Sequence, residues 1–257
     1  MIAVNADDIS IVLRQAGINP GDTLMIHGDS IVAAQLRYKN GVNAQMNELF
    51  TRIVEYLGNE GTLIVPTFTY SFANNEDFDV DNSQSRVGFF SEYFRKMDGV
   101  VRSLDPMFSV AALGKNKNDM KDLSVVNSFG KGSIFEYLHN KNAKIMNLGC
   151  DFLITFTHYV EQDYGVSYRS FKKFSGNIIS QGEGVAVETL FYLRDLTRKS
   201  EMNLSSLRGY LNEHKKISIV PFGRFATYTV SSRDFYDSAK FLLSKNESSL
   251  IEEGVYD

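Results

Sequence analysis

A histidine and a glutamate three residues apart, His158 and Glu161, form a pair with chemical potential. On a helix this spacing places both side chains on one face, where the carboxylate can orient the imidazole or hold its proton. An imidazole oriented in this way is suited to act as a general base near neutral pH. The same spacing also fits a structural hydrogen bond, and the residues alone leave both interpretations open.

Three other segments follow short apolar runs that are typical of β-strands. They are His27-Gly28-Asp29-Ser30, the stretch 66–72, and Gly149-Cys150-Asp151. In α/β sheets, ligands gather outside the carboxyl ends of the strands, so we expect these segments to form three walls of one cleft. Gly28 and its small neighbours would let the backbone approach a ligand, and their N–H groups would stabilise an oxyanion. His27 equally fits a packed strand end.

Several other patterns carry less weight. Cys150 is a candidate nucleophile, but a lone cysteine is more often a small buried hydrophobe. The series Gln181-x-x-Gly184-x-Ala186 matches the acyl-CoA loop of GNAT enzymes, yet it precedes a strand pattern and therefore predicts a hairpin turn. The segment after His27 lacks the closing glycine of a nucleophile elbow, which disfavours a serine hydrolase. The histidine spacing predicts no metal site.

The elements that must position these residues alternate in type up to about residue 165. Apolar periodicity predicts helices at 5–17, 42–58, 88–97, 133–139 and 154–161, and strands at 23–27, 62–65, 109–113 and 144–148. This rhythm is typical of an α/β fold with a mixed, mostly parallel sheet flanked by helices. Later segments predict strands at 184–193, 217–220 and 225–230, and helices at 204–211 and 232–243. We expect one domain, 1–257, with an α/β half at 1–165 and a strand-rich half at 166–257 packed on it.

Composition narrows the class of protein. The chain has 257 residues, of which 43% are hydrophobic and 23% charged, as in an ordinary globular enzyme. Its net charge of −4 provides no basic field for nucleic acid. A single cysteine rules out an internal disulfide and favours a reducing, cytoplasmic location. Asp7 and Asp8 do not fit a signal peptide, and no apolar run is long enough to predict a membrane span.

A longer series of motifs resembles the aminoglycoside 3-N-acetyltransferase family. The matching residues, in chain order, are Pro20-Gly21-Asp22-Thr23 with His27 and Ser30; Gly61 to Phe68; Phe78-Asp79 with Ser85 and Gly88; Gly99 to Ser103 with Pro106, Ser109, Ala112 and Gly114; Phe129-Gly130 with Gly132-Ser133; Leu148-Gly149; Thr155 with His158 and Glu161; Tyr168-Arg169 with Lys172 or Lys173; and Gly223-Arg224 through Arg233-Asp234-Phe235. The likeness spans most of the chain, and the ordered set is far more specific than any single motif.

The resemblance implies an α/β fold distinct from the GNAT fold and transfer of an acyl group from a coenzyme A thioester to an amine on a sugar. It implies that His158 is the catalytic base and Glu161 its partner. We expect coenzyme A contacts from His27, Ser30, Thr67, Arg102, Ser103 and Ser109, and substrate contacts from Phe68, Tyr70, Asp79, Asp105 and Arg169. Two departures stand out: Asp105-Pro106 replaces the usual His-Pro of the family, and His27-Gly28-Asp29-Ser30 replaces the His-Ser-Ser of many members.

The acceptor amine has two interpretations. Phe68, Tyr70 and Phe72 alternate after a strand end and predict a wall for stacking a base, so we favour a nucleotide-linked amino sugar of surface polysaccharide synthesis. The alternative is an aminoglycoside, a polycation that the acidic run Glu76, Asp77, Asp79 and Asp81 would attract. A non-catalytic binding protein of the same fold and a ping-pong enzyme using Cys150 remain further alternatives. The sequence leaves the oligomeric state open, with a homodimer as one option.

Overall fold

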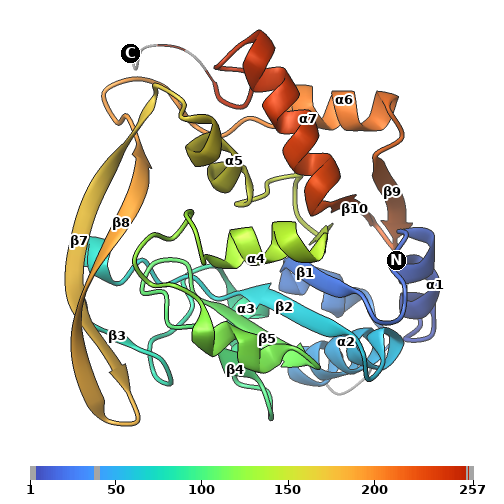
Figure 1. Ribbon diagram of the computed structural model, residues 1–257. Coiled ribbons are helices and arrows are strands. Elements are labelled where there is room, and N and C mark those ends of the chain that lie inside the picture. The colour runs from blue at the N-terminus through green and yellow to red at the C-terminus, as the bar shows by residue number, and fades with distance from the viewer. Residues whose placement is uncertain (1–3, 38–40, 253, 255–257) are drawn as a thin grey trace.

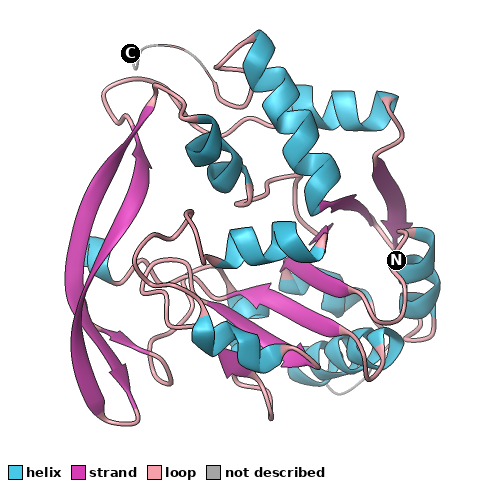
Figure 2. Cartoon of the chain, in the orientation of Figure 1, coloured by secondary structure: helices cyan, strands magenta, loops and turns pink. Residues whose placement is uncertain are grey.

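The computed structural model describes residues 4–37, 41–252 and 254. These residues build a seven-stranded sheet in the order β4-β5-β2-β1-β6-β10-β9 and a three-stranded sheet in the order β3-β7-β8. Helices cover the larger sheet, and the smaller sheet extends along one side of the molecule (Figures 1 and 2).

The first part of the chain alternates helices and strands as predicted. Its elements are α1 (Asp8–Gln15), β1 (Thr23–Gly28), the 3-10 helix η1 (Ser30–Gln35), α2 (Val42–Leu57), β2 (Thr62–Pro66), η2 (Phe72–Asn74), β3 (Phe78–Asp79), α3 (Phe89–Arg95), β4 (Val101–Arg102), β5 (Val110–Gly114), η3 (Lys117–Asp122), α4 (Ile134–Lys141) and β6 (Lys144–Leu148). Helix α2 forms because apolar residues from Met46 to Leu57 recur at helical spacing and bury one face.

The second part contributes α5 (Thr157–Tyr164), β7 (Arg169–Ser180), β8 (Glu183–Arg194), α6 (Ser205–Glu213), β9 (Ile217–Phe222), β10 (Phe225–Ser231) and α7 (Ser232–Lys245). Strand β10 pairs antiparallel with β6, so the larger sheet runs across both parts of the chain. The hairpin β7–β8 lies outside that sheet, and its partner β3 comes from the first part.

The mixed α/β fold is confirmed. Strand β1 pairs in parallel with β2 and with β6, whereas β4, β5, β9 and β10 pair antiparallel. Within the larger sheet, parallel pairing is therefore confined to the central three strands, whose carboxyl ends share one edge; in the smaller sheet, β3 and β7 also pair in parallel. By the rule for open α/β sheets, that edge is where a ligand site is expected.

Successive side chains of the central strands point alternately into two hydrophobic cores. Met25 of β1 joins the core under α4, α5, α6 and α7, while Leu24 and Ile26 join the core under α1, α2 and α3. This alternation follows from the two-residue period of a strand. The helices thus form two layers around the sheet.

Strand β7 is the main element that the sequence did not predict. Most of its side chains are exposed, so it lacks the apolar alternation by which strands are recognised. The turn at Gln181-Gly182 joins β7 to β8, with φ angles of 52° and 82°. The GNAT-like loop motif is therefore a hairpin turn, as predicted.

Candidate functional site

The three segments that follow the strands meet at one cavity. The cavity has a volume of about 470 Å³, and its wall includes His27, Asp29, Tyr70, Cys150 and Thr155. These residues follow or end β1, β2 and β6, so the cavity opens at the carboxyl edge of the parallel strands. The structure thus brings together the three walls that we predicted.

His27 presents a buried nitrogen to this region. Its Nε2 atom has no hydrogen-bond partner among the described residues. Burial lowers the pKa of His27 to about 4, which keeps the imidazole neutral at physiological pH. A buried polar atom without a partner is costly, so a ligand that bonded to Nε2 would recover that cost. Its predicted contact with coenzyme A stays a prediction.

The turn after β1 differs from our expectation. A Cβ atom on Gly28 would lie 2.6 Å from the ring of Phe90, so the glycine is required by packing rather than by the approach of a ligand. Ser30 begins η1, which Asp29 caps by accepting a hydrogen bond from the N–H of Ile31. The N–H of Asp29 donates to Leu148 and is unavailable to an oxyanion.

His158 and Glu161 lie on α5 and are in contact. Nδ1 of His158 is 2.7 Å from Oε2 of Glu161; the glutamate side chain is fully buried and the histidine side chain 16% exposed. The N–H of His158 donates to the carbonyl of Thr155, a residue of the cavity wall. The pair does not itself line the cavity but follows the wall residue Thr155 at the start of α5, and it has the arrangement of a base and its orienting carboxylate.

Burial and charge together set the protonation of this pair. Burial and then the positive charge of Arg169 lower the pKa of His158, against the opposing effect of Glu161. Burial raises the pKa of Glu161, but hydrogen bonds and charges from His158, Arg169 and Tyr168 outweigh it and leave that pKa below its usual range. A neutral imidazole beside an ionised carboxylate follows, which is the form that can accept a proton.

We predicted a substrate contact from Arg169, but its side chain is turned into the protein. Its side chain is 3% exposed, its Nε lies 2.8 Å from Oε2 of Glu161, and its Nη1 donates to the carbonyl of Tyr192. Its charge is used inside the protein. Tyr168, whose hydroxyl donates to Oε1 of Glu161 at 2.8 Å, is a member of this site that sequence reasoning did not assign. Its position beside Arg169 in the shared motif was the available signal.

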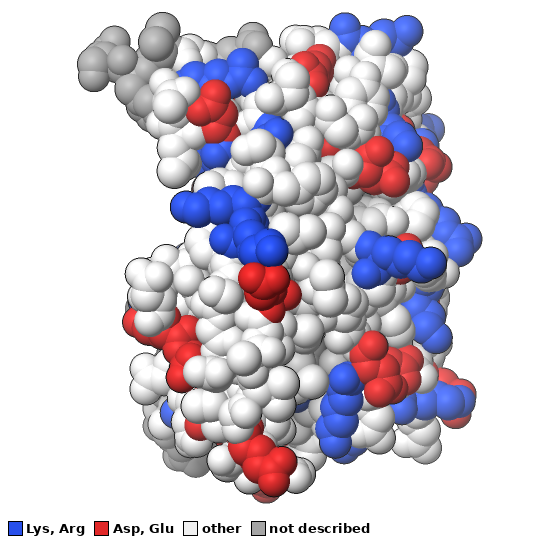
Figure 3. All heavy atoms as spheres, turned by 60° about the vertical axis from the view of Figure 1, so that its left-hand side comes forward, with Lys and Arg blue, Asp and Glu red and all other residues white. Residues whose placement is uncertain are grey.

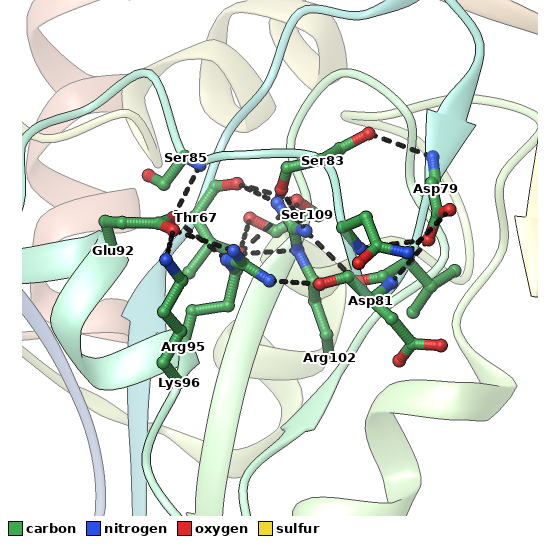
Figure 4. Close-up of polar contacts among 12 residues, drawn as sticks. Thr67, Asp79, Asp81, Ser83, Ser85, Glu92, Arg95, Lys96, Arg102 and Ser109 are labelled. Atoms are coloured by element: carbon green, nitrogen blue, oxygen red, sulfur yellow. Dashed lines mark hydrogen bonds and ion pairs between the residues drawn. The ribbon is translucent and has the colours of Figure 1, made fainter.

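Three predicted coenzyme A contacts, Thr67, Arg102 and Ser109, belong to a buried internal network (Figure 4). Arg102 donates from Nη2 to the carbonyl of Thr67 at 2.9 Å, from Nη1 to that of Ser83 at 2.6 Å, and from Nε to the hydroxyls of Thr67 and Ser109. Ser103 accepts from the N–H of Val110. Burial lowers the pKa of Arg102 to about 9. These bonds tie the loop after β2 to β4 and β5, and the coenzyme A contacts of these residues stay predictions.

Asp105, the residue that replaces the family histidine, is also enclosed. Its Oδ1 accepts hydrogen bonds from the N–H groups of Met107 and Phe108 and from the hydroxyl of Ser128. Burial raises its pKa. Asp105 therefore shapes the loop before β5 rather than facing a substrate.

The aromatic wall is reduced to Phe68 and Tyr70, which both line the cavity. Phe68 and Phe72 are buried in the core, and Phe68 packs edge-on against Phe108. Tyr70 lies at the cavity with a φ of 52°, a backbone region that non-glycine residues rarely adopt. Such strain is often stored at functional sites.

The acidic run serves local structure. Asp79 accepts from the side-chain amide of Asn82 and from the N–H groups of Asn82 and Asp81, which together lower its pKa, and Glu76 pairs with Arg86. The residues of the acidic run do not line the cavity. The carboxylates that do are Asp29 and Asp151, which the sequence reasoning placed in the cleft walls without assigning them a role.

The face of the molecule in Figure 3 shows no broad field of one sign. On the face in Figure 3, basic and acidic side chains lie close together among uncharged atoms. Within residues 4–37, 41–252 and 254, no cluster of three or more His, Cys, Asp or Glu residues is arranged to hold a metal ion. The helices of that same part of the chain include none long and apolar enough to cross a membrane.

Comparison with known proteins places this fold. The aminoglycoside acetyltransferase AAC(3)-Xa superimposes with a TM-score of 0.79 at 19% identity, over 95% of this chain and 93% of that chain. A mutant of AAC(3)-IVa in complex with gentamicin gives 0.78 at 21% identity, over 97% and 92%. AAC-IIIb bound to CoASH gives 0.78 at 15% identity, over 94% and 97%. These likenesses establish a common fold.

The sequence itself establishes the family. Residues 31–244 match the family model for aminoglycoside 3-N-acetyltransferase, a span that includes the His158–Glu161 pair and most of the cavity wall. The resemblance seen in the ordered motifs is confirmed by this match. The chain belongs to the aminoglycoside 3-N-acetyltransferase family and is an acyltransferase.

Proposed function

We propose that this acyltransferase transfers an acetyl group from acetyl-coenzyme A to an amino group of an aminoglycoside. The family match over residues 31–244 supports the reaction type. Relatives of the same fold include one in complex with gentamicin and one bound to CoASH, which supports these two classes of substrate here.

The observation that carries the choice of acceptor is the charge of the cavity wall. Asp29 and Asp151 line the cavity, and both residues are exposed. Exposed carboxylates attract a polycationic sugar, and Tyr70 on the same wall offers a ring edge or face to pack against it. Because the cavity is open, the rest of a large acceptor can extend into solvent.

The protein must remove a proton from the amine, because an ammonium cannot attack a thioester. Acetyl-coenzyme A supplies the activated acetyl group. Nδ1 of His158 is engaged by Glu161, which fixes the tautomer and leaves Nε2 to accept the proton of the amine. The lowered pKa of His158 keeps that nitrogen available near neutral pH. The unpartnered Nε2 of His27 fits a polar group of a bound ligand.

The structure gives less support to the nucleotide-linked acceptor that we expected. It relied on three aromatic faces, of which Phe72 is buried and does not line the cavity, and Phe68 lines it but is only 3% exposed. The comparisons give it no support. The acidic cavity wall and the family match together favour the aminoglycoside.

Release of free coenzyme A thiol tests the proposal directly. We expect turnover when acetyl-coenzyme A is combined with aminoglycosides, and little turnover with neutral or nucleotide-linked amino sugars. His158→Asn should abolish most of the signal, and His214→Asn, which changes an exposed histidine directly after α6, should not. Absence of turnover with every aminoglycoside, from a folded protein that acetylates another amine, would refute this acceptor.

A further inference from the structure

The carboxylate of Glu161 is enclosed by three side chains. Oε2 lies 2.7 Å from Nδ1 of His158 and 2.8 Å from Nε of Arg169, and Oε1 accepts from the hydroxyl of Tyr168 at 2.8 Å. Glu161 is fully buried, and Tyr168 is 1% exposed. Both oxygens are therefore held, and the carboxylate has no freedom to turn away from the imidazole.

Arg169 is anchored independently of the histidine. It is the first residue of β7, and its Nη1 donates at 3.1 Å to the carbonyl of Tyr192 on β8. Tyr192 in turn donates from its hydroxyl to the carbonyl of Val166. The Nε–H of Arg169 is poorly aligned with Glu161, so the contact is an ion pair rather than a good hydrogen bond. What Arg169 contributes to Glu161 is mainly charge.

A histidine paired with a buried, uncompensated carboxylate would be held as imidazolium and would accept no further proton. Here the charge of Arg169 opposes that of Glu161 at short range. Among the described residues, the charged groups that act on His158 are Glu161, on its own helix, and Arg169, from β7. The ring of Phe129, which packs edge-on with its centroid 5.2 Å from that of His158, is uncharged.

We propose that Arg169, assisted by Tyr168, is a positioning residue that balances the charge of Glu161, so that Glu161 orients His158 without trapping it as imidazolium. The inference rests on the proposed role of His158 as the base. It assigns to the start of β7 a function in setting the proton affinity of a side chain on α5.

The test is an NMR titration of His158 in histidine-labelled protein without substrates, with the resonance identified by its loss in His158→Asn. Arg169→Gln should raise the titration midpoint by about one pH unit or more, because the opposing charge is gone. Tyr168→Phe should raise it less. Glu161→Gln should move it in the opposite direction, downward. A purely structural role for Arg169 does not predict that Arg169→Gln and Glu161→Gln shift the titration midpoint of His158 in opposite directions.

Two variants serve as controls. Arg169→Lys keeps the positive charge and should leave the midpoint close to that of the wild type, although the bond to Tyr192 is lost. Arg95→Gln removes another largely buried cation, one paired with Glu92 on α3, and should leave the midpoint unchanged. The acid limb of kcat/KM in the thiol-release assay should move with the midpoint in each variant.

An unchanged or lowered midpoint in Arg169→Gln overturns the inference. If that variant does not fold, Tyr168→Phe decides, and an unchanged midpoint there overturns the inference equally. The proposed function is tested separately. Full turnover in His158→Asn would refute the role of His158 as base, whereas the titration measures the effect of Arg169 and Glu161 on the protonation of His158 in the absence of substrates. Failure of one and failure of the other are therefore distinguishable.

Discussion

The Sγ atom of Cys150 lies 3.3 Å from the backbone carbonyl oxygen of His27 and donates a hydrogen bond to it across the cavity wall. Burial raises the pKa of this thiol. The thiolate, not the thiol, is the reactive nucleophile, so this environment suppresses the reactivity that a ping-pong mechanism would need. The structure thus gives Cys150 the surroundings of a packing residue.

We therefore expect Cys150→Ala to retain most of its turnover. Mass spectrometry of the wild-type protein after incubation with acetyl-coenzyme A alone should show no acetyl adduct on the protein. An adduct at Cys150, together with lost activity in the variant, would establish a covalent carrier instead of direct transfer.

His158→Asn should lower kcat by about 10²-fold or more, because the amine loses the group that accepts its proton. The affinity for coenzyme A, measured by calorimetry, should change little, since His158 acts on the proton rather than on the cofactor. A variant that keeps near-normal kcat at saturating substrate contradicts the assignment of His158 as base.

Glu161→Gln should destabilise the fold as well as slow the reaction. The substitution leaves the buried guanidinium of Arg169 without its counter-charge, and breaking a buried pair in this way costs about 3 to 5 kcal/mol. Urea unfolding measures the loss. The matched control is Glu188→Gln, which removes the exposed ion pair with Lys173 and should cost less than about 1 kcal/mol. Equal losses in the two variants would show that the pair of Glu161 and Arg169 is not energetically special.

Strongly periodic elements were predictable from the sequence, because their burial repeats with the period of the element. Helix α2 and strands β1 and β2 lie where we expected them. Strand β7 was missed since it packs on the core only in part, and its pairing with β8 is set by backbone hydrogen bonds that leave no apolar pattern.

For the site, local spacing was informative and residue type alone was not. The contact between His158 and Glu161 follows from a separation of three residues on one helix. Arg102 has the chemistry of a phosphate ligand, but its donors are consumed by Thr67 and Ser83, whose positions depend on how distant segments pack. Whether a polar side chain faces a ligand or the protein is a tertiary property, which one sequence does not display.

His27 should make the fold sensitive to mild acid. Its pKa is about 4 in the folded protein, whereas the ordinary value is 6.5, so the unfolded chain takes up a proton that the folded protein does not. Stability from this group is present above the unfolded pKa and is lost as pH falls from about 6.5 towards 4, by up to about 3 kcal/mol. His27→Gln should flatten that part of the curve of unfolding free energy against pH. His214→Asn, at an exposed site, should leave the slope as it is, and an unaltered slope in His27→Gln would contradict the prediction.

The acceptor can be decided by salt and by the carboxylates of the cavity wall. If an aminoglycoside binds beside Asp29 and Asp151, its KM should climb with ionic strength, because exposed charge pairs are screened within about 10 Å at 0.1 M salt. Asp151→Asn should raise that KM several-fold and weaken its salt dependence, with little change in the KM for acetyl-coenzyme A.

Asp81→Asn is the matched control for this prediction, because its carboxylate is exposed but lies outside the cavity. It should leave the KM of the acceptor unchanged. A nucleotide-linked acceptor makes the opposite forecast: Asp151→Asn would not raise KM, and salt would have little effect. Tyr70→Ala does not separate the two acceptors, because the ring of Tyr70 can pack against either one. Efficient turnover of the nucleotide-linked amino sugar alone, together with that pattern, would rule out the aminoglycoside as the acceptor. A wall of carboxylates repels the negatively charged diphosphate of such a sugar, so this acceptor would bind only if packing on the ring of Tyr70 dominated.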